Sequence, residues 1–237
     1  MICNVKNKGV GLNPLRQMHY MAVLHKYSQN HETIRGLEIG SWLGASAIVF
    51  MICVENFFKD GTLVCCDLWE LESDLNKFKD NIVTWGIQDR ISLLRGDSRK
   101  VLEALAPKSF DVVFIDGNHS YPFIKSDIQQ AKRLVKDDGF ICGDDMELGY
   151  SVCPDADSLK ECIKWFERGM SYHPGVTKAV WEEFGIDESY EGFWIAEKDG
   201  DAYRILGLEG QSLFRPAFVP SEAWQGVVEK YIRETTK

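Results

Sequence analysis

An aspartate and a histidine three residues apart, Asp116 and His119, are the side chains of this sequence that are best placed for chemistry. They follow an apolar run at residues 112–115, which predicts a buried strand of a parallel sheet. Such a strand brings its last side chains to the crevice beyond the carboxyl ends of the sheet, where α/β folds bind ligands. Because an imidazole titrates near neutral pH, His119 is also suited to proton transfer. The segment therefore predicts a reactive ligand site in an α/β protein.

The composition favours one domain that binds a small molecule. At 237 residues and 45% hydrophobic content, the chain is long enough for one sizeable core. The formal net charge is −9 and no window concentrates lysine and arginine, so a surface that follows nucleic-acid phosphates is not expected. A small or cationic ligand fits this charge better.

The seven cysteines indicate reduced thiols. They include no C-x-x-C pair, and several lie in apolar runs, so the sequence predicts neither a disulfide framework nor a zinc site. The first residues lack the regions of a signal peptide, and no apolar run approaches the roughly 18 residues of a membrane span. We expect a cytoplasmic protein with no membrane partner, and the sequence leaves its oligomeric state open, a homo-oligomer included.

Strands and helices are expected to alternate over the first 146 residues. The apolar patterns predict strands at 33–39, 62–66, 90–94, 110–115 and 140–142, and helices at 14–30, 45–57, 72–85, 100–106 and 121–134. After residue 146 the pattern changes to a segment with Gly, Pro, Asp and Ser, which predicts an inserted lid at 147–172 with one short helix at 159–166. The remainder predicts a helix at 176–184, a hairpin of 192–196 with 202–206, and a tail with a helix near 221–233.

The turn after the first strand carries glycines in the spacing G-x-x-x-G, at Gly40 and Gly44, with Glu38 two residues before them. A glycine turn between a strand and a helix lets the backbone approach a nucleotide-like ligand at the helix N-terminus. A dinucleotide pyrophosphate requires G-x-G-x-x-G instead, whereas Glu38 can meet the cationic group of an amino-acid tail.

Acidic residues also follow the second and third strands. Asp67 lies at the distance along the chain at which an acid hydrogen-bonds ribose hydroxyls. Leu68 and Trp69 are candidates to flank a base, although Trp69 can equally cap the core. Asp97 has two interpretations as well, as the cap of the next helix or as a residue near an adenine.

Five segments in this order resemble the class I S-adenosylmethionine-dependent methyltransferases: LEIGSWLGAS, CCDLW, LLRGDS, FDVVFIDGNHSY and LVKDDGFICGDD. The sequence is most similar to the branch that contains macrocin O-methyltransferase and the protein called cephalosporin hydroxylase, and more distantly to the metal-dependent catechol O-methyltransferases. The resemblance covers residues 33–146 and the C-terminal helix and hairpin, but not the lid at 147–172, and it implies a Rossmann-like α/β fold with a mostly parallel seven-stranded sheet and a C-terminal antiparallel hairpin. We therefore expect a single domain made of an N-terminal arm and helix, a cofactor-binding core, the inserted lid, and a C-terminal helix, hairpin and tail, at 1–32, 33–146, 147–172 and 173–237.

The resemblance also implies which residues bind S-adenosylmethionine. The first loop surrounds the amino-acid end of the cofactor, Asp67 accepts hydrogen bonds from the ribose, and the third strand ends near the adenine. The implied cofactor-binding set is Glu38, Gly40, Ser41, Gly44, Ser46, Asp67, Leu68, Trp69, Asp97, Ser98 and Asp116.

For catalysis, the resemblance implies divalent-metal ligands at Asp116, Asp144 and Asp145, and a general base at His119. Three converging carboxylates repel one another, and Mg²⁺ or another hard divalent cation offsets that repulsion. Asn118 departs from the family by replacing an acid often found in this turn, and Asp144 departs by replacing the Glu of some relatives. The purely structural interpretations are that Asp144 and Asp145 cap a helix and that His119 is a hydrogen-bonded turn residue.

The implied activity is O-methylation of a small-molecule hydroxyl, on a sugar or a natural product of polyketide type. The metal would lower the pKa of the hydroxyl while a base takes its proton. The alternatives are N-methylation of a small amine, a non-catalytic S-adenosylmethionine-binding protein, and a nicotinamide-dependent oxidoreductase, which the absence of G-x-G-x-x-G disfavours. His173, before a Pro-Gly pair, is expected to be structural rather than to touch a substrate.

Overall fold

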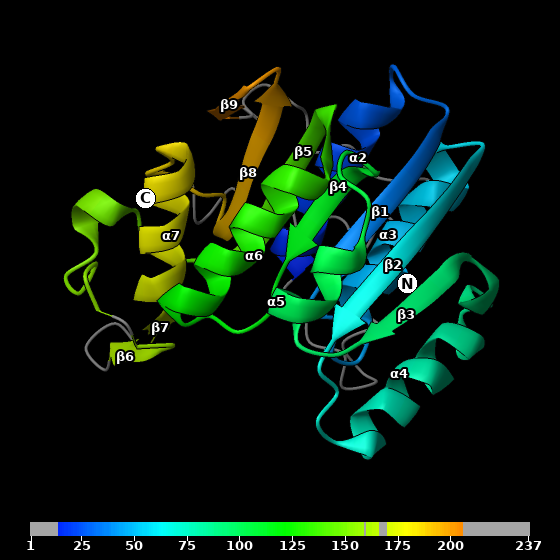
Figure 1. The fold of residues 1–237 in the computed structure, drawn as a ribbon, viewed down its shortest axis with the longest axis horizontal. Helices are drawn as coiled ribbons and strands as arrows, with labels where there is room; N and C mark the ends of the chain where they lie inside the picture. The colour runs from blue at the N-terminus through cyan, green and yellow to red at the C-terminus, as the bar shows by residue number, and fades with distance from the viewer. Residues whose placement is uncertain (1–13, 159, 166–169, 206–237) are drawn as a thin grey trace.

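A seven-stranded sheet with the strand order β3-β2-β1-β4-β5-β8-β9 forms the centre of the protein. This computed structural model describes residues 14–158, 160–165 and 170–205 (Figure 1). Strands β1 to β5 are parallel, whereas β8 pairs antiparallel with β5 and β9 pairs antiparallel with β8. The strands are β1 (Thr33–Ile39), β2 (Asp60–Asp67), β3 (Ile91–Arg95), β4 (Phe110–Ile115), β5 (Val135–Met146), β8 (Gly192–Asp199) and β9 (Ala202–Ile205). The predicted fold class, with its C-terminal antiparallel hairpin, is confirmed.

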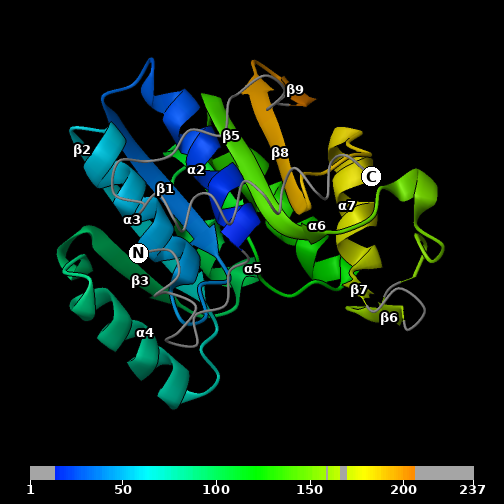
Figure 2. The ribbon, with the colours of Figure 1, turned by 180° about the vertical axis from the view of Figure 1, so that it is seen from behind.

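Helices cover both faces of the sheet. Figure 1 shows α6 and α7 in front of it, and Figure 2, from behind, shows α2 and α3 on the other face. The helices are α2 (Pro14–Ser28), α3 (Ala45–Phe57), α4 (Glu72–Thr84), α5 (Ser98–Val101), α6 (Tyr121–Leu134) and α7 (Pro174–Phe184), with 3-10 turns η1 (Gln88–Arg90), η2 (Leu102–Ala104) and η3 (Tyr150–Val152).

Strand β4 lies between these two layers. All six of its residues are buried. Val112 and Phe114 pack into the core cluster beneath α2, α3 and α4, while Val113 and Ile115 pack into the cluster beneath α6 and α7. A continuous apolar run is therefore required, because side chains alternate between two buried faces.

The strand register aligns the ends of the central strands. Ile39 of β1 pairs with Cys66 of β2 and with Ile115 of β4, and Ile115 pairs in turn with Gly143 of β5. The residues that follow these positions are Gly40, Asp67, Asp116 and Asp144. Four separate motifs are thus brought to one edge of the sheet.

Two predicted elements differ from the structure. Strand β5 begins at Val135 rather than at 140, because Val135 pairs with Phe110 and Phe140 with Val112, so that residues 136–139 bulge opposite a single residue. The helix predicted at 159–166 is wrong for residues 163–165, which form strand β6 (Ile163–Trp165) paired antiparallel with β7 (Met170–Tyr172). The predicted arm at 1–13 and the tail helix at 221–233 lie outside the described residues.

The described cysteines are all unpaired. Cys53, Cys65, Cys66, Cys142 and Cys153 are buried, and Cys162 is exposed. Among the described helices, none has the length and apolar content needed to span a bilayer.

Candidate functional site

A cleft of about 520 Å³ opens at the carboxyl ends of β1, β2 and β4. This volume is in the range of small-molecule and cofactor sites. Six of the predicted cofactor-binding residues line it, namely Gly40, Asp67, Leu68, Asp97, Ser98 and Asp116. The aromatic rings of Trp42 and Phe123 line it as well, so the cleft combines apolar faces with carboxylate acceptors, and this fits an adenosine group.

Asp67 joins the two loops that border the cleft. Its Oδ2 accepts hydrogen bonds from the backbone N–H groups of Ser41, at 2.9 Å, and Trp42, at 2.8 Å, and its Oδ1 accepts one from Trp69 N–H at 2.7 Å. A carboxylate that accepts several backbone N–H bonds organises the loop around it. Asp67 is therefore an anchor of the glycine loop in addition to being a cleft residue.

Glu38 and the serines near it lie beneath the cleft. Glu38 is fully buried, and its Oε1 accepts a hydrogen bond from Ser46 Oγ at 2.6 Å. Burial raises the pKa of the Glu38 carboxyl to about 8, although the hydrogen bond from Ser46 acts in the opposite direction. Gly44, at φ +88°, precedes α3 and packs against Phe78. The structure thus places Glu38, Ser41, Gly44 and Ser46 around the loop rather than on the cleft wall.

The buried carboxyl of Glu38 predicts a pH-dependent stability. Its pKa is near 8 in the folded protein and near 4.5 for an exposed glutamate, so the folded state holds its proton more tightly and this contribution to stability is lost as pH rises from about 4.5 to 8. The Glu38→Gln variant should gain stability relative to wild type across this interval, by up to about 1.4 kcal/mol per pH unit. Urea unfolding at pH 5, 6, 7 and 8 measures the difference. Glu55→Gln, at an exposed position, is the control, and a difference for Glu38→Gln that did not change with pH would contradict the assignment.

Trp69 occupies the core rather than the cleft. It is 2% exposed, its ring meets Phe78 edge-on at 5.0 Å, and its indole N–H donates to the Trp42 carbonyl at 2.8 Å. The interpretation that Trp69 flanks a base is therefore not supported, and the core interpretation is the one observed. Trp42, which sequence reasoning missed, lines the cleft instead and is 55% exposed. Its position inside the glycine loop was the available signal.

The third-strand end forms a compact polar corner of the cleft. Asp97 caps α5 through Arg99 N–H at 3.1 Å and binds the Arg99 guanidinium through both oxygens, at 2.9 and 2.7 Å. That guanidinium lies 3.9 Å from the centre of the Phe123 ring. Ser98 Oγ donates to Asp127 at 2.7 Å, and burial raises the pKa of Asp127 to about 6. Asp97 is thus a helix cap that also lines the cleft, and its place near an adenine stays a prediction.

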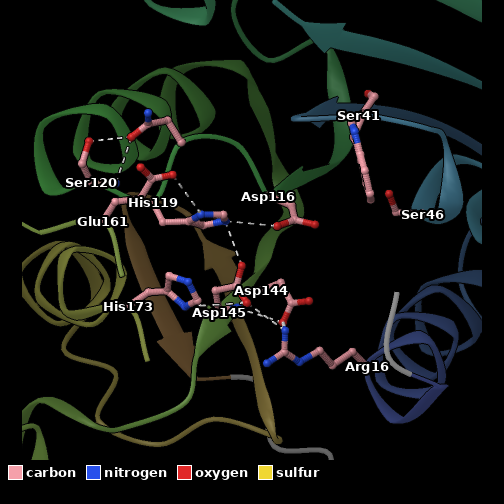
Figure 3. A network of polar contacts seen from close by, with 12 residues as sticks. Arg16, Ser41, Ser46, Asp116, His119, Ser120, Asp144, Asp145, Glu161 and His173 are labelled. Atoms are coloured by element: carbon pink, nitrogen blue, oxygen red, sulfur yellow. Dashed lines mark hydrogen bonds and ion pairs between the residues drawn. The ribbon is translucent and has the colours of Figure 1, made fainter. Parts of the chain in front are cut away.

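His119 lies between two of the predicted metal ligands. Its Nε2 is 2.8 Å from Asp145 Oδ2 and 3.4 Å from Asp116 Oδ1, and its Nδ1 is 3.8 Å from Glu161 Oε1 (Figure 3). Burial lowers the pKa of His119, but the hydrogen bonds to Asp116 and Asp145 outweigh it and raise that pKa to about 10. These two partners thus favour the protonated form of His119.

The surroundings shift the pKa values of the three acids in different directions. Loss of solvent and the charge of Asp145 raise the pKa of Asp116, and burial with the charge of Asp116 raises that of Asp144. Burial acts to raise the pKa of Asp145 too, but His119 holds it well below its usual range. Asp145 also has a left-handed backbone, at φ +65°, which sends its side chain toward His119 while Asp144 stays buried.

Arg16 of α2 reaches the same acids from the other side. Its Nη1 is 2.7 Å from Asp144 Oδ1 and 2.9 Å from Asp145 Oδ1, and its Nη2 is 3.3 Å from Glu147 Oε1 (Figure 3). Sequence reasoning missed Arg16, because an arginine on an amphipathic helix is normally a surface residue.

His173 joins the cluster as well. Its Nδ1 is 3.1 Å from both Glu147 oxygens and 3.8 Å from Asp145 Oδ1, and its ring centre is 4.8 Å from that of His119. His173 immediately precedes α7, and the start of this helix packs closely against the backbone of His119. The contact is so close that a side chain at Gly175 would come within 2.5 Å of the His119 carbonyl oxygen. His173 therefore lies in the acidic cluster, and the expectation that it is structural stays a prediction.

Two overlapping ligand sets result. Asp116 and Asp145 both contact His119, and Asp144 and Asp145 both contact Arg16, so the three predicted metal ligands are linked through these two partners. An all-oxygen set of this kind would suit a hard divalent cation. His119, Asp145 and His173 offer ligand atoms within 4.8 Å of one another, and a set with two imidazoles fits a transition metal.

Known proteins resemble the chain in both sequence and fold. Residues 37–146 match the model of a family described as a methyltransferase domain. Among solved structures, a candidate O-methyltransferase from Klebsiella pneumoniae has 20% identity and a TM-score of 0.60, covering 84% of this chain and 88% of its own. TomG from Streptomyces achromogenes, an O-methyltransferase of tomaymycin synthesis in complex with SAM, has 21% identity and a TM-score of 0.55, covering 77% and 80%. Cofactor-bound Rv0187 from MTB has 20% identity and a TM-score of 0.59, covering 81% and 83%. A comparison with curated proteins finds no match.

Proposed function

We propose that the protein, whose residues 37–146 match the model of a methyltransferase-domain family, transfers the methyl group of S-adenosylmethionine to a hydroxyl of a small molecule with the help of a divalent cation. One observation carries this proposal. Asp116 lines the cleft and also contacts His119 in the acidic cluster, so a cofactor in the cleft and an acceptor at the cluster would be neighbours.

The cofactor is proposed to lie in the cleft with its adenosine between Asp67 and the corner of Asp97 and Ser98. Asp67 would accept hydrogen bonds from the ribose, and Trp42 and Leu68 would cover the bound adenosine. Glu38 and the glycine loop support the amino-acid end from below. Gly40 has φ +89° and a side chain there would overlap the Asp116 carbonyl, so the loop is held directly against the end of β4.

His119 is proposed as the general base. Methyl transfer breaks the bond between carbon and the sulfonium sulfur, which keeps the electron pair, and forms a bond between carbon and the acceptor oxygen, while the hydroxyl proton passes to His119 Nε2. A divalent cation held by Asp116, Asp144 and Asp145 would lower the pKa of the hydroxyl and engage the oxygens that otherwise keep His119 protonated. Alignment of the two substrates and exclusion of water would supply the remainder of the rate enhancement.

The acceptor is proposed to be a sugar or a natural product, and the lid residue Glu161, beside His119, to contribute to its choice. N-methylation of a small amine and non-catalytic binding of S-adenosylmethionine are the alternatives. The acids and the imidazole at the cleft favour O-methylation, because a pure binder has no need of a base. We also propose a cytoplasmic location, since the six described cysteines are free.

Calorimetric titration tests this proposal. S-adenosylhomocysteine should bind the purified protein with and without EDTA, and Mg²⁺ should then bind the loaded protein. Asp144→Asn should weaken Mg²⁺ at least tenfold, because it removes a charged ligand from the oxygen set, and His173→Ala should not. The exposed lid variant Asp157→Asn is the control. A reversed pattern, with Mn²⁺ or Zn²⁺ binding lost in His173→Ala and retained in Asp144→Asn, would replace the three-acid site with the imidazole set.

A further inference from the structure

Arg16 is held by contacts to other protein groups at the place where the cation would bind. Its side chain is 16% exposed, although it comes from the first turn of α2, more than a hundred residues before its partners. Besides the contacts of Nη1 and Nη2 to Asp144, Asp145 and Glu147, its Nε donates to the Glu191 carbonyl at 2.9 Å. Every guanidinium nitrogen has an acceptor, so Arg16 is not displayed to bind a substrate.

The contacts of Arg16 engage two of the four carboxylate oxygens that Asp144 and Asp145 would offer to a cation. Nη1 lies within 2.9 Å of one oxygen of Asp144 and one oxygen of Asp145. A hard divalent cation binds carboxylate oxygens at about 2.0–2.6 Å. A guanidinium and a divalent ion on these oxygens would be about 4 Å apart or less, and like charges at that distance repel strongly where solvent is scarce. The Arg16 guanidinium and a divalent ion would therefore compete for these two oxygens.

Charge compensation gives Arg16 a reason to be there. Asp144 is 5% exposed, and a buried carboxylate without a partner is costly. In the absence of a metal ion, Arg16 supplies the positive charge that this acid and Asp145 require. The acids around it still outnumber the groups that can carry a positive charge, because the four acids Asp116, Asp144, Asp145 and Glu147 contact three such groups among the described residues, Arg16, His119 and His173.

We propose that Arg16 is a built-in substitute for the metal ion. It neutralises Asp144 and Asp145 in the metal-free protein and must leave their oxygens before a divalent cation binds. Arg16 thereby weakens the affinity for the cation and keeps the metal-free site folded. The inference rests on the proposed cation site.

Arg16→Met tests the inference, since methionine keeps an unbranched apolar stem and removes the charge. In protein loaded with S-adenosylhomocysteine, Arg16→Met should bind Mg²⁺ at least tenfold more tightly than wild type by calorimetry. In the presence of EDTA, the Tm of Arg16→Met should be several degrees below that of wild type. Mg²⁺ should then raise the Tm of Arg16→Met by more than it raises the Tm of wild type. Lys26→Met, on the same helix, makes the same change in net charge away from the site and should match wild type.

Arg16→Lys is the second variant, should the methionine variant fail to fold. It keeps one positive charge and loses the planar fork, so its Mg²⁺ affinity should fall between those of wild type and Arg16→Met. Equal Mg²⁺ affinities in wild type and both variants would overturn the role of Arg16 and leave the cation site standing. No Mg²⁺ binding in any variant that binds S-adenosylhomocysteine would overturn both the cation site and the role of Arg16.

Discussion

Replacing His119 with alanine should reduce methyl transfer by about 10²- to 10⁴-fold, the usual contribution of a positioned general base. The imidazole lies 2.8 Å from Asp145 and 3.4 Å from Asp116, which lines the cleft, and the described residues bring one other imidazole, His173, beside it. The rate should be measured at saturating S-adenosylmethionine with an acceptor found by screening small hydroxyl compounds. The affinity for S-adenosylhomocysteine should change less than about threefold, since His119 does not line the cleft.

The matched control for this experiment is His31→Ala. His31 precedes β1 at the opposite edge of the sheet, where its ring stacks on Tyr27 at 3.8 Å. Its removal should leave the rate unchanged within about twofold. If His119→Ala kept the full rate at pH 7 while His173→Ala lost it, the base would be His173.

Replacing Asp67 with alanine should weaken S-adenosylhomocysteine binding by about 100-fold or more. The variant loses the proposed acceptor for the ribose and also leaves the backbone N–H groups of Ser41, Trp42 and Trp69 without their shared carboxylate. Each lost charged hydrogen bond costs about 1.5–3 kcal/mol, so more than one such loss exceeds a factor of 100 in affinity. Calorimetry gives the affinity, and thermal unfolding shows whether the variant is folded.

An analogue without the ribose hydroxyls separates the two roles of Asp67. Wild type should bind this 2′,3′-dideoxy analogue more weakly than S-adenosylhomocysteine, and Asp67→Ala should bind both about equally. Asp60→Asn, at the other end of β2, is the control. Undiminished affinity in Asp67→Ala would rule out the proposed ribose position, and an equal preference for the natural ligand in both proteins would restrict Asp67 to holding the loops.

Local patterns were enough to predict the parallel strands and the acids at their ends, whereas the seven-stranded sheet was implied by the resemblance. The apolar run before Asp116 predicts a strand that is buried on both faces, and parallel strands that begin and end together must bring Asp67, Asp116 and Asp144 to one edge. The first helix, the first strand and the helix after the glycine loop follow from periodicity in the same way. Each of these features is determined by residues that are close to it in the sequence.

Features that depend on distant partners were missed. Arg16 reaches its acids across the whole core, and nothing near it in the sequence marks it as a site residue. Trp42 and Trp69 are both aromatic residues in loops beside a strand end, and only the packing against Phe78 decides which of them is buried. In the lid, residues 163–165 have an apolar spacing that also suits a helix, and pairing with 170–172 selects the strand.

The distribution of thiols makes the lid accessible to selective chemical labelling. Five of the described cysteines are buried, whereas Cys162 is exposed and follows Glu161, whose carboxylate faces His119. With Cys3 changed to serine, a maleimide fluorophore would attach to Cys162 in the folded protein without denaturing it. The dye would stand next to the segment proposed to select the acceptor, so its emission would report acceptor binding in real time, including for compounds that bind without being methylated.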